Sequence, residues 1–123
     1  MKDSGGDFFG CWGGIASLQL ELSAVWTGAR ARGVAPERIV EWMSEAPARL
    51  GGFSGTKGAI SAGFDADITI WDPEASFVVD PYLLRHRHPV TPYAGRTLYG
   101  TVEATLVRGE EVFSSRPNQM TSQ

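Results

Sequence analysis

A chain of 123 residues, 42% of them hydrophobic and 20% charged, has the composition of an ordinary globular protein and is long enough for one domain or a part of one. Its net charge of -3 provides no basic field that would attract nucleic acid or an anionic membrane surface. The single cysteine, Cys11, excludes an intrachain disulfide, and no apolar run approaches the ~20 residues of a membrane span.

Residues 1–14 are predicted to form a loop, and the protein is predicted to be cytoplasmic. Residues 1–6 lack the apolar core of a signal peptide, and residues 1–14 are rich in glycine, which favours irregular structure. Cys11 has no histidine near it in the sequence, so it is predicted to pack as a small apolar group and not to act as a nucleophile.

The spacing of apolar residues then becomes helical. Five of them recur at intervals of three and four: Ile15, Leu18, Leu22, Val25 and Ala29. Gly33 is expected to end this helix. A second helix is predicted to begin at Pro36 and to be interrupted at Pro47, with one short turn before the glycines at 51 and 52.

In the second half of the chain the apolar period falls to two, which is typical of strands. Residues 68–71 and 77–79 predict two short strands, each closed by an Asp-Pro pair. Residues 101–108 and 111–113 predict a hairpin. A loop of roughly twenty residues separates the strands, and loops of this length in a compact domain indicate that other chain segments cover them. The organisation therefore predicts a fragment of a larger fold.

Residues 57–72, KGAISAGFDADITIWD, resemble the K-G-x-I-x-x-G-x-D-A-D-x-x-x-x-D signature of amidohydrolases. In that family the signature belongs to a small β-sandwich beside a catalytic (β/α)8 barrel. Its glycines permit tight turns with positive φ. Asp65 and Asp67 are expected to cap loop amides and not to form an acid–base pair. The stretch is therefore interpreted as a scaffold element.

Two further segments resemble the allantoinase branch of this family. Residues 6–19 are similar to the loop that follows the eighth barrel strand, and residues 86–98 are similar to a second allantoinase segment. Hydantoinases and dihydropyrimidinases usually carry N-G-x-P-G-x-E where this chain reads GGIASLQ at 13–19. The resemblance covers nearly all of residues 6–113.

The resemblance implies an α/β fold, cut from the C-terminal end of an amidohydrolase (β/α)8 TIM barrel and part of its accompanying β-sandwich. Residues 1–52 would be a loop and helices from the end of the barrel. Residues 53–113 would belong to the sandwich, and residues 114–123 would form a flexible tail.

The function that the resemblance implies is hydrolysis of a cyclic amide, here the opening of the hydantoin ring of allantoin to allantoate in purine breakdown. Family members use two divalent metals, usually zinc, to activate a bridging hydroxide, and whole members are commonly homotetramers. The family's set of metal ligands is not found in this chain. The isolated chain is therefore expected to be inactive, with no catalytic and no metal-binding residues of its own.

Gly13 and Gly14 are the predicted substrate contacts, because they match the loop in which related enzymes hold the ring amide through backbone groups. Glycine lets a backbone approach a ligand closely, although a simple turn into the helix would explain the pair equally well. Trp12 could line the same pocket. His86 and His88 copy the spacing of a metal-ligand pair, but they are the only histidines, and the sequence favours packing or interface roles for them.

Three alternatives stay open at this point. The chain could come from a hydantoinase, dihydropyrimidinase or dihydroorotase with another ring substrate. It could be a non-catalytic module that docks on a full-length amidohydrolase, or a truncated gene product. In each case the apolar stripe that begins at Ile15 is expected to be exposed when the barrel is absent.

Overall fold

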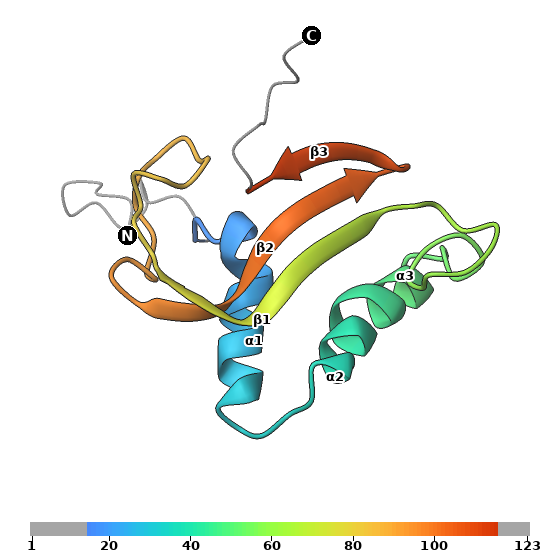
Figure 1. Ribbon diagram of the computed structural model, residues 1–123, viewed down its shortest axis with the longest axis horizontal. Helices are drawn as coiled ribbons and strands as arrows, with labels where there is room; N and C mark the ends of the chain where they lie inside the picture. The colour runs from blue at the N-terminus through green and yellow to red at the C-terminus, as the bar shows by residue number, and fades with distance from the viewer. Residues whose placement is uncertain (1–14, 116–123) are drawn as a thin grey trace, which may run out of the picture.

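The computed structural model describes residues 15–115, in which the helices precede a three-stranded sheet (Figure 1). The elements in chain order are the 3-10 helix η1 (Leu18–Leu20), α1 (Glu21–Arg30), α2 (Glu37–Val40), the π-helical turn η2 (Glu41–Glu45), α3 (Ala46–Leu50), β1 (Ile68–Val78), β2 (Thr97–Val107) and β3 (Glu110–Ser114). None of these helices is both long and apolar enough to cross a membrane.

The predicted first helix is confirmed by η1 and α1, and it packs against β2. Leu20 and Trp26 are buried on the side that faces the sheet, and Ala29 is buried in a cluster with Ile39 of α2. Ser23 is also buried there, and its hydroxyl donates a hydrogen bond of 2.6 Å to the carbonyl of Gly100. Of the predicted stripe, Ile15, Leu18 and Val25 are exposed, whereas Leu22 and Ala29 pack in the second core cluster.

The second helical segment runs to Leu50, so the short turn predicted before Gly51 and Gly52 is confirmed, but the interruption predicted at Pro47 is not observed. Proline has no N–H and normally breaks a helix at its own position. Here the backbone widens just before the proline, where the Ala46 N–H donates to the carbonyl of Glu41, five residues earlier. Such a π-helical turn changes the register of the hydrogen bonds, so that Pro47 sits in the first turn of α3, where no N–H is needed.

The prediction that a strand ends at Asp72-Pro73 is wrong, because β1 is one strand of 11 residues that ends at Val78, shortly before the second Asp-Pro pair. Its register against β2 shifts between Asp72, opposite Thr101, and Ser76, opposite Tyr99. The extra residues form a bulge. The Asp72 carboxylate accepts the N–H groups of Glu74 at 2.8 Å and Ala75 at 3.2 Å, so these amides are satisfied without the sheet.

The predicted hairpin is confirmed as β2 and β3, although β2 begins earlier than expected, at Thr97. Its turn residues, Arg108 and Gly109, have φ values of 51° and 83°, which is the conformation of a tight hairpin turn. The long loop is also present. Its ends are held together because the Val79 N–H donates to Arg96 and the Gly95 N–H donates to Val79.

The core consists of two small clusters on the face of the sheet that α1 covers. Leu20, Val79 and Leu98 form one, and Trp26, Ala29 and Ile39 form the other. The β1 and β2 strands cross α1 in Figure 1, while α2 and α3 stand away from it beside the long loop that leads into β1.

Candidate functional site

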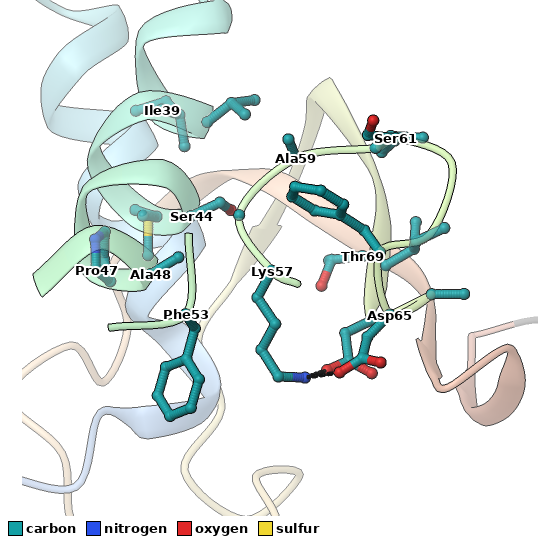
Figure 2. Close-up of a pocket in the computed structure, with 18 of the residues that line it drawn as sticks. Ile39, Ser44, Pro47, Ala48, Phe53, Lys57, Ala59, Ser61, Asp65 and Thr69 are labelled. Carbon is teal, nitrogen blue, oxygen red and sulfur yellow. Dashed lines mark hydrogen bonds and ion pairs between the residues drawn. The ribbon is translucent and has the colours of Figure 1, made fainter. Parts of the chain in front are cut away.

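A cleft of about 640 Å³ lies between the α2–α3 segment and the chain that leads into β1 (Figure 2). Most of its wall is apolar and includes Leu22, Ile39, Met43, Phe53, Phe64 and Trp71. Charged side chains gather at one place only, where Lys57 points at Asp65 (Figure 2) and also reaches Asp67.

Lys57 joins both aspartates of the D-A-D motif. Its Nζ lies 2.9 Å from Asp65 Oδ2 and also forms an ion pair with Asp67 Oδ2. The second oxygen of Asp67 accepts the N–H of Arg108 at 2.9 Å. The predicted capping role is thus confirmed for Asp67, whose capped amide belongs to the β2–β3 turn. Asp65 instead serves as a second counter-ion.

These contacts favour the charged forms of Lys57 and Asp67. Hydrogen bonding to Asp67, then to Asp65, raises the pKa of Lys57 above its ordinary value. Hydrogen bonding from Lys57, then from the Arg108 N–H, lowers the pKa of Asp67. A general acid or base needs a pKa near the working pH. Both shifts move away from neutrality, so this cluster fixes a loop and does not transfer protons.

The ion pairs lead to a pH-dependent stability. Because the folded-state pKa of Asp67 lies below its ordinary value of 3.8, its stabilisation is present above pH 3.8 and is lost as the pH falls through the folded pKa. We therefore expect Asp67→Asn to lower Tm at pH 7 by a small amount, because the pair is exposed, and the difference from wild type to shrink below pH 3.8. Thermal unfolding between pH 2 and pH 7 measures this. Glu111→Gln, which also removes one carboxylate but lies on exposed β3, serves as the control. A flat curve for Asp67→Asn would contradict the assignment.

Gly58 explains why the signature needs a glycine beside the lysine. Its φ is +91°, and a Cβ there would lie 2.7 Å from the Ala48 Cβ and 3.1 Å from the Ser44 carbonyl. The loop therefore rests directly on α3. Gly63 has a similar φ of +87° but open space around it, so its role is conformational only.

A second cleft, of about 280 Å³, lies where the chain enters η1. Residues 15–20 form one wall and Leu84, Arg85 and His86 form the other. The Gln19 side-chain carbonyl accepts the Arg85 N–H at 2.8 Å and ties the two walls together. Gly13 and Gly14, the predicted substrate contacts, lie outside the described residues, as do Cys11 and Trp12, and their roles stay predictions.

The two histidines are placed differently. His86 is half-buried, and its Nε2 lies 2.9 Å from the Pro81 carbonyl. Since a carbonyl can only accept, Nε2 carries the proton. His86 Nδ1 is buried without a hydrogen-bond partner among the described residues, and His88 is exposed. Between residues 15 and 115, no three His, Cys, Asp or Glu side chains lie close enough together to hold a metal ion. This part of the chain therefore does not fit a zinc pair.

The sequence of this chain is similar to those of several known proteins. The profile of the amidohydrolase family matches residues 6–112. An allantoinase of Streptomyces avermitilis is 52% identical over 108 residues, which are 88% of this chain and 24% of that protein. An allantoinase of Arabidopsis thaliana is 42% identical over 112 residues, 89% of this chain and 22% of that protein. A D-phenylhydantoinase of Escherichia coli is 34% identical over 114 residues, 92% of this chain and 25% of that protein.

Solved structures show the same fold. A D-hydantoinase superposes with a TM-score of 0.81 at 29% identity, over 88% of this chain and 24% of that one. The L-hydantoinase of Arthrobacter aurescens superposes with a TM-score of 0.78 at 33% identity and the same coverage. The chain thus spans about a quarter of the length of the relatives that it matches.

Proposed function

This chain belongs to the amidohydrolase family, and from that premise we propose that it is the C-terminal portion of an allantoinase-like hydrolase, which opens the hydantoin ring of allantoin to allantoate. The observation that carries the proposal is the 52% identity to the Streptomyces avermitilis allantoinase, against 34% to the Escherichia coli D-phenylhydantoinase. The substrate of the complete enzyme would be allantoin or a similar cyclic amide. We place the enzyme in the cytoplasm and its reaction in purine breakdown.

The role that we propose for this portion is structural support of a catalytic centre built elsewhere. Amidohydrolases are generally metal-dependent, but residues 15–115 contain no group that could hold an ion. We assign the two zinc ions to the three quarters of the relatives' length that this chain does not match. The isolated chain would then be inactive. Gly13 and Gly14 remain its proposed substrate contacts, and a homotetramer its proposed assembly.

The division of the chain is part of the same proposal. Residues 1–52 would complete the barrel and residues 53–113 would belong to the β-sandwich. The tail predicted from residue 114 does not begin there, because Ser114 is the last residue of β3 and the Ser115 N–H donates to the Glu103 carbonyl. The hydrogen bond from the Arg108 N–H to Asp67 supports this division, because it fixes the loop before β1 to the β2–β3 turn within the second segment.

We expect the purified chain to hydrolyse no allantoin above a metal-only blank when zinc is added, because it brings no ligand set. Release of allantoate from allantoin measures this directly. Steady turnover above the blank would contradict the proposed division of labour.

Chimeras test the substrate. Residues 6–112 would replace the aligned segment in two hosts, the Streptomyces avermitilis allantoinase and the Escherichia coli D-phenylhydantoinase. We expect the allantoinase host to retain more of its own activity than the hydantoinase host does, since 52% identity preserves more contacts than 34%. The opposite order would favour a hydantoinase-type segment. Loss of activity in both hosts would favour a docking module or a truncated product.

A further inference from the structure

The loop that connects β1 to β2, residues 80–96, is braced by hydrogen bonds of its own. The Asp80 carboxylate accepts the Tyr82 N–H at 2.9 Å, which is a local turn typical of aspartate. The His86 Nε2–H donates to the Pro81 carbonyl at 2.9 Å. The other ring nitrogen of His86 is buried, so the imidazole is part of the interior of the loop. We call residues 80–96 the braced loop.

The braced loop is fastened to the beginning of the first helix by two neighbouring residues. Leu84 packs on the core cluster that contains Leu20 of η1. The next residue, Arg85, donates its N–H to the Gln19 side-chain carbonyl at 2.8 Å, across 66 positions of the sequence. Because both contacts end on η1, the braced loop and η1 must move together.

The entry to η1 is the segment that these contacts hold in place. The Ser17 carbonyl accepts the Leu20 N–H at 2.7 Å and closes the first turn, and residues 15–17 face residues 84–86 across the smaller cleft. Gly13 and Gly14, the proposed substrate contacts, come directly before Ile15 in the sequence. A group that binds a substrate must be held to within about 0.5 Å. Contacts that fix the entry to η1 therefore also restrict where the Gly14 backbone can lie.

We propose that Gln19 and His86 are positioning residues for the substrate loop of the enzyme. Gln19 ties η1 to the braced loop, and His86 keeps that loop in the shape that presents the Arg85 N–H. This inference rests on the proposed function and adds to it the side chains that place Gly13 and Gly14. Neither side chain acts by touching the substrate. What Gln19 must supply is an acceptor, which a carboxylate of the same length also provides and a hydrocarbon does not.

Substitutions in the allantoinase-host chimera test the proposal. Gln19→Leu removes the acceptor, and His86→Phe keeps a ring but loses the N–H. We expect each to raise KM for allantoin about 3- to 10-fold, which corresponds to the loss of one hydrogen bond. The value of kcat should change less than about twofold, because looser positioning weakens binding of the substrate and of the transition state alike. Gln19→Glu keeps an acceptor and should retain the wild-type KM.

Thr27→Val is the matched control. The Thr27 hydroxyl accepts the Tyr99 N–H at 2.8 Å, so it too forms a bond from a side chain of the first helical segment to a distant backbone amide. Thr27 lies on α1 and does not line the smaller cleft. Its substitution should lower Tm but leave KM unchanged. If Gln19 had only a structural role, Gln19→Leu would likewise change Tm alone.

Hydrogen exchange in the isolated chain measures the contact without any substrate. The Arg85 amide should exchange at least severalfold faster in Gln19→Leu than in wild type, and equal rates would overturn the inference. In a chimera that hydrolyses allantoin, an unchanged KM in Gln19→Leu, or an equal rise in Thr27→Val, would overturn the inference and leave the proposed function standing.

The substrate is tested separately. A chimera that hydrolyses hydantoin in place of allantoin, with a KM that Gln19→Leu raises, would uphold the positioning role and reject allantoin as the substrate. A chimera that is inactive on both rings would overturn the positioning role together with the proposed function.

Discussion

Trp26→Ala should lower the free energy of unfolding by about 3–5 kcal/mol, the usual cost of removing a large aromatic side chain from a core. Trp26 is only 3% exposed, and its ring meets that of Trp71 edge-on at a centroid distance of 5.6 Å. Its indole N–H also donates a 2.8 Å hydrogen bond to the carbonyl of Pro73. The substitution therefore opens a cavity and leaves a bulge carbonyl without its donor.

Urea unfolding followed by circular dichroism measures this loss. Trp42→Ala is the matched control, because Trp42 is 43% exposed on η2 and its ring lies beneath the Arg38 guanidinium; its loss should stay below about 1 kcal/mol. Trp26→Phe keeps a ring but no N–H and should cost an intermediate amount. Equal losses for Trp26→Ala and Trp42→Ala would show that this core does not stabilise the fold.

The elements that the sequence predicted correctly are those governed by local signals. The spacing of apolar residues and Gly33 locate α1, and Gly109 locates the turn of the β2–β3 hairpin. The prediction failed at Asp72-Pro73, where a local turn signal lies inside β1. The bulge there is held by Trp26, which is 47 residues away in the sequence. No local pattern could indicate that contact.

The features of the candidate site, too, were only partly predictable from local sequence. The resemblance correctly marked residues 57–72 as a scaffold, but neither the bond between Lys57 and the two aspartates nor the capped amide of Arg108, 41 residues from Asp67, is a property of a short motif. The same reason explains the stripe on α1. Periodicity shows which residues are apolar, but contacts distant in sequence decide which of them are buried: Ala29 is buried, whereas Leu18 is exposed.

Gly100→Ala is the second substitution for which we expect a large loss, because two independent effects combine at this position. The φ of Gly100 is +88°, which costs a residue with a Cβ about 1–2 kcal/mol. The new Cβ would also lie 2.9 Å from Trp26 Cδ1 and 3.1 Å from Trp71 Cζ3. Overpacking of this kind typically costs about a further 1–3 kcal/mol. The shift in urea midpoint should thus approach that of Trp26→Ala.

Two glycine controls separate these effects. Gly63→Ala meets the same positive φ in open space and should show the conformational cost alone, while Gly55→Ala has neither problem and should be close to neutral. If the clash with the tryptophans is real, Gly100→Ala must cost less in a Trp26→Leu background than in wild type, with a coupling of about 0.5–3 kcal/mol. Strict additivity of the two substitutions would assign the whole loss to backbone strain. In that case a glycine would be required at this position by its positive φ and not by the close approach of β2 to α1.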